Sequence, residues 1–129
     1  MIIPFVITVG IENSVLKNDT KVQNHLGSIH AGAQFTFAEA ASGRYLFSLF
    51  PEIQEYIIPL LRESSIKYKK QAMTELSSEV SVDKEDLEKF LRQFESKGRA
   101  TIVAYVVLKD KEGDITCEGS FKWFVQSRE

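Results

Sequence analysis

Residues 31–50 constrain the fold more than any other part of this sequence, because they are apolar around most of a helical circumference. The apolar side chains do not gather on one face, as they would in a helix at the surface. They are Ala33, Phe35, Phe37, Ala38, Ala40, Ala41, Tyr45, Leu46, Leu49 and Phe50. Gly32 and Gly43 allow a neighbouring backbone to approach closely, and Pro51 ends the segment. The sequence therefore predicts a buried helix, which needs apolar surface on all sides.

Most of the remaining chain has hydrophobic residues on alternate positions, which is typical of β-strands. We predict strands at 5–16, 56–70, 72–82, 100–108 and 115–125. Asp110-Lys111-Glu112-Gly113 predicts a hairpin turn between the last two. A long antiparallel sheet wrapped around the central helix would bury that helix economically. The predicted fold class is therefore α+β.

A second helix is predicted at 83–97, between the strand pairs. Ser81 or Asp83 can cap its start, and Gly98 provides the residue that ends it. Its apolar residues form a single narrow stripe, consisting of Leu87, Phe90, Leu91 and Phe94. This helix is therefore expected to be an extra helix on the surface.

Length and composition favour one domain over residues 1–129. The net charge of -2 gives no strong field that would attract nucleic acid or an anionic membrane. The one cysteine, Cys117, favours a reducing compartment and is expected to be an ordinary strand residue. Residues 1–9 are interpreted as part of a strand rather than a signal peptide. No apolar run reaches the length of about 18 residues that spans a bilayer, so we expect a cytoplasmic protein.

Glu39 is the most informative residue of the apolar helix. A carboxylate in such surroundings must be paired, protonated or hydrated in a cavity. Desolvation raises the pKa of a carboxyl group toward the range that suits a general base. The alternative is a structural glutamate that accepts a hydrogen bond from a hydroxyl group at a helix contact. The position of Glu39 alone does not decide between the two.

The loop before the helix contains groups that can bind a developing negative charge. Gly27 and Gly32 permit close approach of a ligand to the backbone. The amides of Ala31 and Gly32 lie at the helix start, where N–H groups point outward, and Asn24 adds an amide donor. Glu39 lies two turns further along, about 11 Å away. One carbonyl group of a ligand therefore cannot contact both these amides and the Glu39 carboxylate of the same chain. A second subunit would have to supply the carboxylate.

The spacing of these residues resembles the phenylacetyl-CoA-type thioesterases of the hotdog superfamily. Their motif is N-x-x-G-T-x-H-G-G, followed by six residues and an aspartate. The residues in register here are Asn24, Gly27, His30, Gly32 and Glu39. The segment 65–72 resembles the third-strand signature of the same family, and the resemblance extends from about residue 4 to residue 125, with 83–97 as an insertion.

The resemblance implies a hotdog fold and hydrolysis of acyl-coenzyme A thioesters, with no cofactor beyond the coenzyme A of the substrate. Catalysis would fall to Glu39 and Asn24, with the Gly32 amide polarising the thioester carbonyl. The partners implied are an acyl-CoA and a second copy of the chain, as a homodimer or a dimer of dimers. Ala31, His30, Gly27 and Ser65 are the further residues expected to contact the substrate.

The sequence departs from the family pattern at four positions. Ala31 replaces the first glycine of the pair, and Glu39 replaces the aspartate. Gln71 stands at the usual proline of the third strand. Leu61 aligns with a serine that positions water in some members, and we expect Glu63 and Ser65 to share its face of the strand. A non-catalytic module that binds acyl-CoA therefore stays open as an alternative.

Other interpretations of single residues have less support. His25 precedes Glu39 by fourteen residues, a spacing similar to that of hotdog β-hydroxyacyl dehydratases, but the glycines do not fit that motif. A metal site would need a third ligand beside His25 and His30. Lys69 and Lys70 could meet the phosphates of coenzyme A, although lysine on a strand edge more often prevents aggregation.

Overall fold

The computed structural model describes residues 3–12, 14–52 and 54–128. Within these residues six strands form one antiparallel sheet, in the order β1-β2-β4-β5-β6-β3. The strands are β1 (Ile11–Glu12), β2 (Val15–Leu16), β3 (Ile57–Tyr68), β4 (Leu76–Val82), β5 (Arg99–Lys109) and β6 (Ile115–Ser127). The α-helices are α1 (Pro4–Val9), α2 (Ala31–Ser48) and α3 (Lys84–Lys97), and short 3-10 turns occupy Thr20–Val22 and Gln54–Tyr56.

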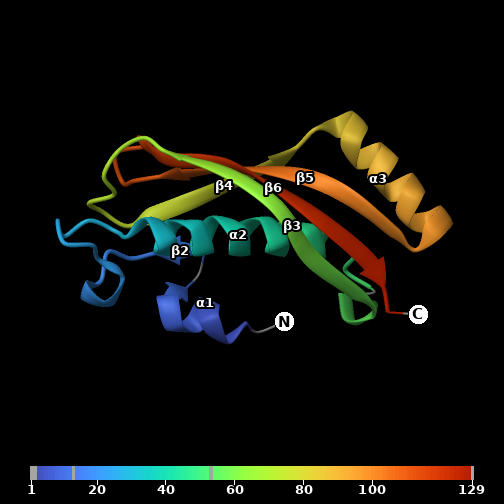
Figure 1. Ribbon diagram of the computed structural model, residues 1–129, viewed down its shortest axis with the longest axis horizontal. Helices are drawn as coiled ribbons and strands as arrows, with labels where there is room; N and C mark the ends of the chain where they lie inside the picture. The colour runs from blue at the N-terminus through green and yellow to red at the C-terminus, as the bar shows by residue number, and fades with distance from the viewer. Residues whose placement is uncertain (1–2, 13, 53, 129) are drawn as a thin grey trace.

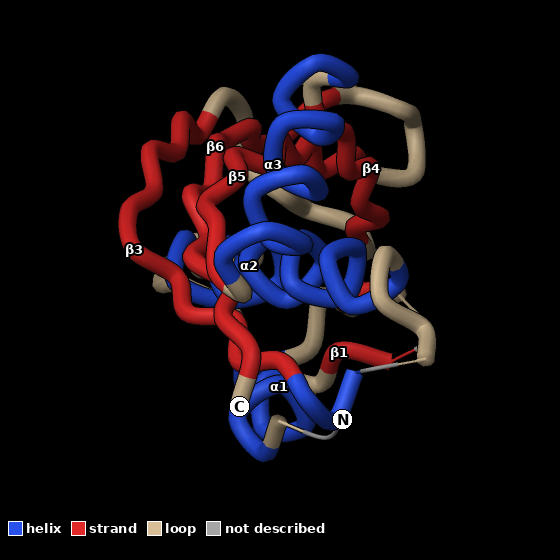
Figure 2. The backbone as a smooth tube through the Cα atoms, turned by 90° about the vertical axis from the view of Figure 1, so that its right-hand side faces the viewer, coloured by secondary structure: helices blue, strands red, loops and turns tan. Residues whose placement is uncertain are grey.

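The sheet curls around α2, as Figures 1 and 2 show from two directions. Side chains from the inner face of the sheet and from α2 make a common core, whose largest fully buried members include Phe37, Leu46, Leu108, Phe121 and Val125. The predicted fold class, a long antiparallel sheet around a central helix with an extra surface helix, is confirmed. In the described ranges, no helix has the length and apolar character that crossing a bilayer requires.

Two close contacts fix α2 against β6. Gly43 lies against the Trp123 ring, where an added Cβ atom would be 3.4 Å away. Beside it, the indole N–H of Trp123 donates to the buried Ser42 hydroxyl at 2.8 Å. This bond satisfies the polar atom of Trp123 within an apolar core. The position of the helix relative to the strand is thereby specified.

The predicted strand at 5–16 is wrong, because its first half forms α1 and its second half forms two short strands, β1 and β2, that pair antiparallel with each other. Pro4 lies in the first turn, where its missing N–H removes no helical bond. Gly10 ends the helix with a φ of 87°, a left-handed conformation that glycine adopts readily. The β-branched residues between them disfavour a helix by only a few tenths of a kcal/mol each. Packing of α1 on α2, with Val9 buried, outweighs that preference.

The helix α3 lies at the surface, as predicted, beside the first part of β5. The pairing of β4 with β5 ends at Val82 and Ala104, and α3 contacts β5 beyond that point. Phe90 and Phe94 of α3 pack on Phe50, whose ring centroid lies 6.1 and 5.0 Å from theirs. The helix therefore closes the sheet where β4 is too short to do so.

Candidate active site

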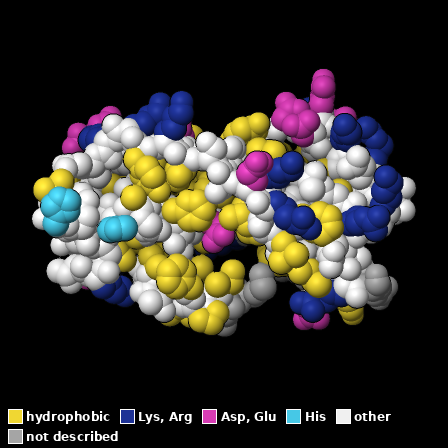
Figure 3. Space-filling view, in the orientation of Figure 1, with side chains coloured by type: hydrophobic (Ala, Val, Ile, Leu, Met, Phe, Trp, Pro, Cys, Tyr) yellow, Lys and Arg dark blue, Asp and Glu magenta, His cyan; other side chains and the backbone are white. Residues whose placement is uncertain are grey.

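Glu39 lies in the middle of α2 and is the only acidic residue of that helix. It is half-buried, and desolvation raises the pKa of its carboxyl group. Within the described ranges, no hydrogen bond or ion pair reaches this carboxylate. In the face shown in Figure 3, an acidic side chain borders a hollow over the middle of α2, among hydrophobic side chains. The structural alternative, a glutamate satisfied by a neighbouring hydroxyl, finds no partner here.

Glu39 lies on the flank of α2 that faces β6 and the edge strand β3. One turn before it, Phe35 contacts Phe121 of β6, with ring centroids 5.5 Å apart. One turn after it, Gly43 lies against Trp123 of β6. Residues four apart share a flank of a helix, so Glu39 points in the same direction. Beyond β6 in this direction lies β3, the last strand of the sheet.

A β-bulge in β3 determines which of its side chains face α2. Leu61 pairs with the inward-facing Trp123, whereas Glu63 pairs with the exposed Lys122, so that Arg62 is the extra residue. Directly paired residues of two antiparallel strands point to the same face. The expectation that Leu61, Glu63 and Ser65 share one face is therefore wrong.

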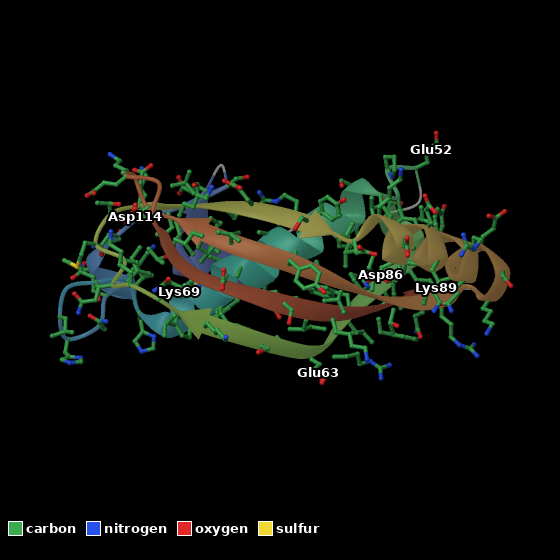
Figure 4. The ribbon with its side chains drawn as sticks, turned by 90° about the horizontal axis from the view of Figure 1, so that it is seen from above. Glu52, Glu63, Lys69, Asp86, Lys89 and Asp114 are labelled. Atoms are coloured by element: carbon green, nitrogen blue, oxygen red, sulfur yellow. The ribbon has the colours of Figure 1, made fainter. Side chains whose placement is uncertain are left out.

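The same bulge brings a serine toward the helix that sequence analysis did not identify. Ser64 pairs with the inward-facing Phe121, whereas Ser65 pairs with Ser120 on the outer face. Figure 4 shows Glu63, a neighbour of Ser64 in the strand, on the rim of the sheet along β3. Ser64, rather than Ser65, lies on the side of β3 that faces Phe35 and the flank of Glu39. The sequence does not reveal that Ser64 faces the helix, because no residue pattern identifies the bulge.

Asn24 organises the loop that precedes α2. Its side-chain oxygen accepts hydrogen bonds from the backbone N–H groups of Leu26 and Ser28, at 2.9 and 3.2 Å. Gly27 completes the turn with a φ of 77°, and its carbonyl accepts a bond from the Asn18 side chain. Both backbone bonds go to the oxygen of the Asn24 amide, and its NH₂ group has no acceptor within the described residues. The loop therefore holds an amide donor in a fixed position.

His30 caps the start of α2 with its side chain. Its Nδ1 atom accepts the Gly32 N–H at 2.8 Å, so the proton of the neutral ring is on Nε2. The Gly32 amide, which we expected to be free for a ligand, is thus occupied by His30. The Ala31 N–H, at the first position of the helix, has no acceptor among the described residues.

The two groups of site residues are separated within one chain. Asn24, Gly27, His30, Ala31 and Gly32 lie together at the start of α2. Glu39 lies further along α2, and Ser64 lies on the side of β3 that faces α2. The seven-position step along the helix from Gly32 to Glu39 amounts to about 11 Å. A single copy of the chain does not bring the carboxylate to the amide donors.

The other candidate residues have structural partners. Lys69 lies 2.9 Å from Glu118, and Lys70 lies 3.0 and 2.6 Å from Asp110 and Asp114. These pairs form at the hairpin end of the sheet, where Figure 4 labels Lys69 and Asp114. Both lysines lie just after the end of β3, and each is held in an ion pair with a neighbouring carboxylate.

Cys117 and the histidines give no sign of a reactive thiol or a metal centre. Cys117 is fully buried on β6, and desolvation raises the pKa of its thiol to about 12, which makes it unreactive. His25 lies exposed in the loop. Among residues 3–12, 14–52 and 54–128, no group of three or more His, Cys, Asp or Glu could hold a metal ion.

Comparison with known proteins gives one family and many similar structures. The model of the domain of unknown function DUF4442 matches residues 4–125. Among curated proteins, none matches the chain. Three of the similar solved structures come from Pseudomonas aeruginosa, Bacillus halodurans and Streptococcus pneumoniae.

The Pseudomonas protein is described as of unknown function and a probable thioesterase. It is 22% identical, with a TM-score of 0.75 over 97% of this chain and 88% of that one. The Bacillus protein was solved with CoA and is 21% identical, with a TM-score of 0.75 over 97% and 77% of the two chains. The Streptococcus protein, a hypothetical thioesterase with coenzyme A, is 24% identical, with a TM-score of 0.67 over 89% and 78%. These similarities establish the hotdog fold.

Proposed function

The chain belongs to the DUF4442 family, and on this premise we propose that it hydrolyses acyl-CoA thioesters at a site formed between two copies. The observation that carries the proposal is the carboxyl group of Glu39. It is half-buried, has a raised pKa and has no partner in the described part of the chain. A carboxyl group in that state suits a general base. The coenzyme A bound to two proteins of similar structure supports the choice of substrate class.

A second copy of the chain would pair along β3. This strand ends the sheet and has twelve residues, of which only one side is paired, with β6. A long unpaired strand edge is a template for another strand. Antiparallel pairing of β3 with its copy is self-complementary, as a two-fold axis requires. Such pairing would place the flank of Glu39 from one copy opposite the amide turn of the other.

Two hollows in the surface of a single copy lie away from the proposed site. One lies beside Asp86 and Lys89 of α3, and the other beside Arg62 and Lys122. None of the residues predicted for the site lines either hollow. Neither hollow is therefore assigned to the thioester.

The proposed reaction begins with a water molecule held between Glu39 and the Ser64 hydroxyl. Glu39 accepts a proton from this water molecule while the oxygen of the water attacks the carbonyl carbon of the thioester. The negative charge that develops on the carbonyl oxygen is stabilised by the Asn24 NH₂ group and the Gly32 N–H of the partner copy. The C–S bond then breaks, and the thiolate of coenzyme A takes the proton from Glu39 to leave as a thiol. Direct attack by the Glu39 carboxylate, followed by hydrolysis of the anhydride, would use the same groups.

His30 must move before the Gly32 amide can contribute. Its Nδ1 atom lies where the carbonyl oxygen of a substrate would accept the same N–H. Rotation of the exposed imidazole ring about its side-chain bonds would release the amide. The substrate oxygen would then take over the bond that His30 makes in the free protein.

Hydrolysis of a panel of acyl-CoAs tests the proposal. The wild type is expected to release free thiol from one or more of them, measured with a thiol reagent. Glu39→Gln keeps the size of the side chain but removes the base, and is expected to lower kcat by about 100-fold or more. Equal rates for the two proteins would contradict the proposal.

A non-catalytic module that binds acyl-CoA is the second candidate. Leu61 at the expected serine position and the occupied Gly32 amide favour it. It predicts binding of acyl-CoA by calorimetry with no turnover, and binding that survives Glu39→Gln. Turnover of any thioester in the panel that depends on Glu39 would rule it out.

A further inference from the structure

Side chains hold the peptide group between Ala31 and Gly32 at both of its ends. The Gly32 N–H donates to His30 Nδ1 at 2.8 Å. On the opposite side, the Tyr68 hydroxyl donates to the Ala31 carbonyl oxygen at 3.0 Å. These are the N–H and C=O of one peptide group. Its N–H is the amide that the proposed function assigns to the thioester carbonyl.

Tyr68 reaches this peptide from the end of β3. It pairs with Cys117, whose side chain is on the inner face of the sheet, and so points toward α2. The residue remains 45% exposed, so its packing contributes little to the core. Desolvation and the neighbouring Cys117 raise the pKa of its hydroxyl, which therefore remains a proton donor at neutral pH. The described residues provide no other side-chain donor to the Ala31 carbonyl.

We propose that Tyr68 is a positioning residue of the thioester site, which fixes and polarises the Ala31–Gly32 peptide from behind. A hydrogen bond to the carbonyl oxygen of a peptide strengthens the N–H of the same peptide as a donor. It also restrains the plane of the peptide, and hence the direction of the N–H. The effect is largest when the substrate oxygen carries negative charge. This inference rests on the proposed function, because it concerns the donor that stabilises the oxyanion.

The position of Tyr68 also connects the oxyanion donor to the proposed dimer contact. Tyr68 ends the strand whose free edge would pair with the partner copy. The peptide that it holds starts α2. Pairing of the two β3 strands would therefore restrain Tyr68, and through it the Gly32 N–H.

Tyr68→Phe tests the proposal, because it removes the hydroxyl and keeps the ring. Tyr105→Phe is the matched control, since Tyr105 is exposed on the outer face of β5, the face of the sheet turned away from α2. We expect Tyr68→Phe to lower kcat by about three- to tenfold with KM within about twofold of wild type. The melting temperatures of the two variants are expected to agree. If Tyr68 had only a structural role, Tyr68→Phe would lower the melting temperature, and the kinetic loss would not fall on kcat alone.

A second measurement does not depend on turnover. In the amide NMR spectrum, Gly32 is one of only seven glycines, and its proton resonance is expected to move upfield in Tyr68→Phe but not in Tyr105→Phe. An unchanged Gly32 resonance would overturn the inference, and so would an unchanged kcat in an active enzyme. If the wild type hydrolyses no acyl-CoA, the proposed function fails. The Gly32 resonance then decides whether Tyr68 polarises the peptide.

Discussion

At the scale of single residues, the site depends on a carboxyl group that the fold leaves without a partner. Desolvation raises the pKa of Glu39, so its deprotonated, basic form predominates at a higher pH than it does for an ordinary glutamate. We expect kcat to rise with pH through this raised pKa and then to level off. A pH profile of kcat on one acyl-CoA measures it. A profile that is flat down to the ordinary pKa of glutamate would contradict the assignment of Glu39 as the base.

The same pKa shift predicts how stability depends on pH. The folded protein holds the Glu39 proton more tightly than the unfolded chain does, so its stability is highest below the unfolded pKa and falls as pH rises through the folded pKa. Glu39→Gln removes this loss. Its melting temperature is expected to exceed that of wild type at pH 7 and to equal it in acid. Thermal unfolding at both pH values checks the sign, and a variant that is less stable at pH 7 would indicate a hidden partner for the carboxylate.

Removing the His30 side chain is expected to give a variant that is less stable but binds substrate more tightly. His30→Ala removes the side-chain cap of α2, which should cost about 1 kcal/mol of stability. It also frees the Gly32 amide, so KM should fall while kcat stays close to that of wild type. Steady-state kinetics and thermal unfolding measure the two effects. A large loss of kcat would instead make His30 a group that contacts the substrate.

Sequence analysis identified some of these residues and could not identify others. The apolar helix pointed to Glu39, the loop before it to Asn24, and the resemblance to a family motif to His30. Ser64 could not be found, because its direction depends on a bulge that forms only when β3 pairs with β6. The contact between Tyr68 and Ala31 joins residues 37 positions apart, and a single sequence carries no signal of it.

At the scale of helices and strands, the conformational preference of the local sequence predicted the structure wherever tertiary packing favoured the same conformation. The predicted bounds of α2 and α3 differ from the structure by at most two residues, because apolar periodicity and caps act within the segment. In α1 the residues alternate as in a strand, but contact with α2 determines the conformation. Tertiary contacts change the conformation of short segments most easily, since few local hydrogen bonds favour either a helix or a strand there.

The contact between β6 and β3 predicts a strongly destabilising substitution. A Cβ atom at Gly119 would lie 2.7 Å from the backbone oxygen of Ser65. Backbone cannot rotate away as a side chain can, so Gly119→Ala should force the strands apart. We expect it to lower the free energy of unfolding by about 2 kcal/mol or more, measured by urea denaturation.

Gly43→Ala is the comparison for this prediction. The added Cβ atom would lie 3.4 Å from the Trp123 ring, an ordinary contact, and alanine favours a helix by about 1 kcal/mol over glycine. We expect a neutral or slightly stabilising effect. If the two variants were equally unstable, the close approach at Gly119 would not be the cause.

At the scale of the whole molecule, the two groups of residues that the proposed site requires lie apart on the same helix within one copy of the chain. The α+β architecture and its wrapped sheet followed from the sequence, since a helix apolar on all sides needs such a cover. How two copies of the chain pack against each other does not follow from the sequence or from the structure of one copy. The free edge of β3 and the separation between Gly32 and Glu39 are the structural grounds for placing the site between two copies.

Complementation between two inactive variants tests this arrangement most directly. Glu39→Ala and Asn24→Ala are each expected to lose acyl-CoA hydrolysis. When equal amounts are unfolded together and refolded, half of the dimers contain both chains, and each of these has one intact site. The account predicts recovery of about a quarter of wild-type kcat in the mixture. A mixture as inactive as the separate variants would contradict a site that joins Glu39 of one copy to Asn24 of the other.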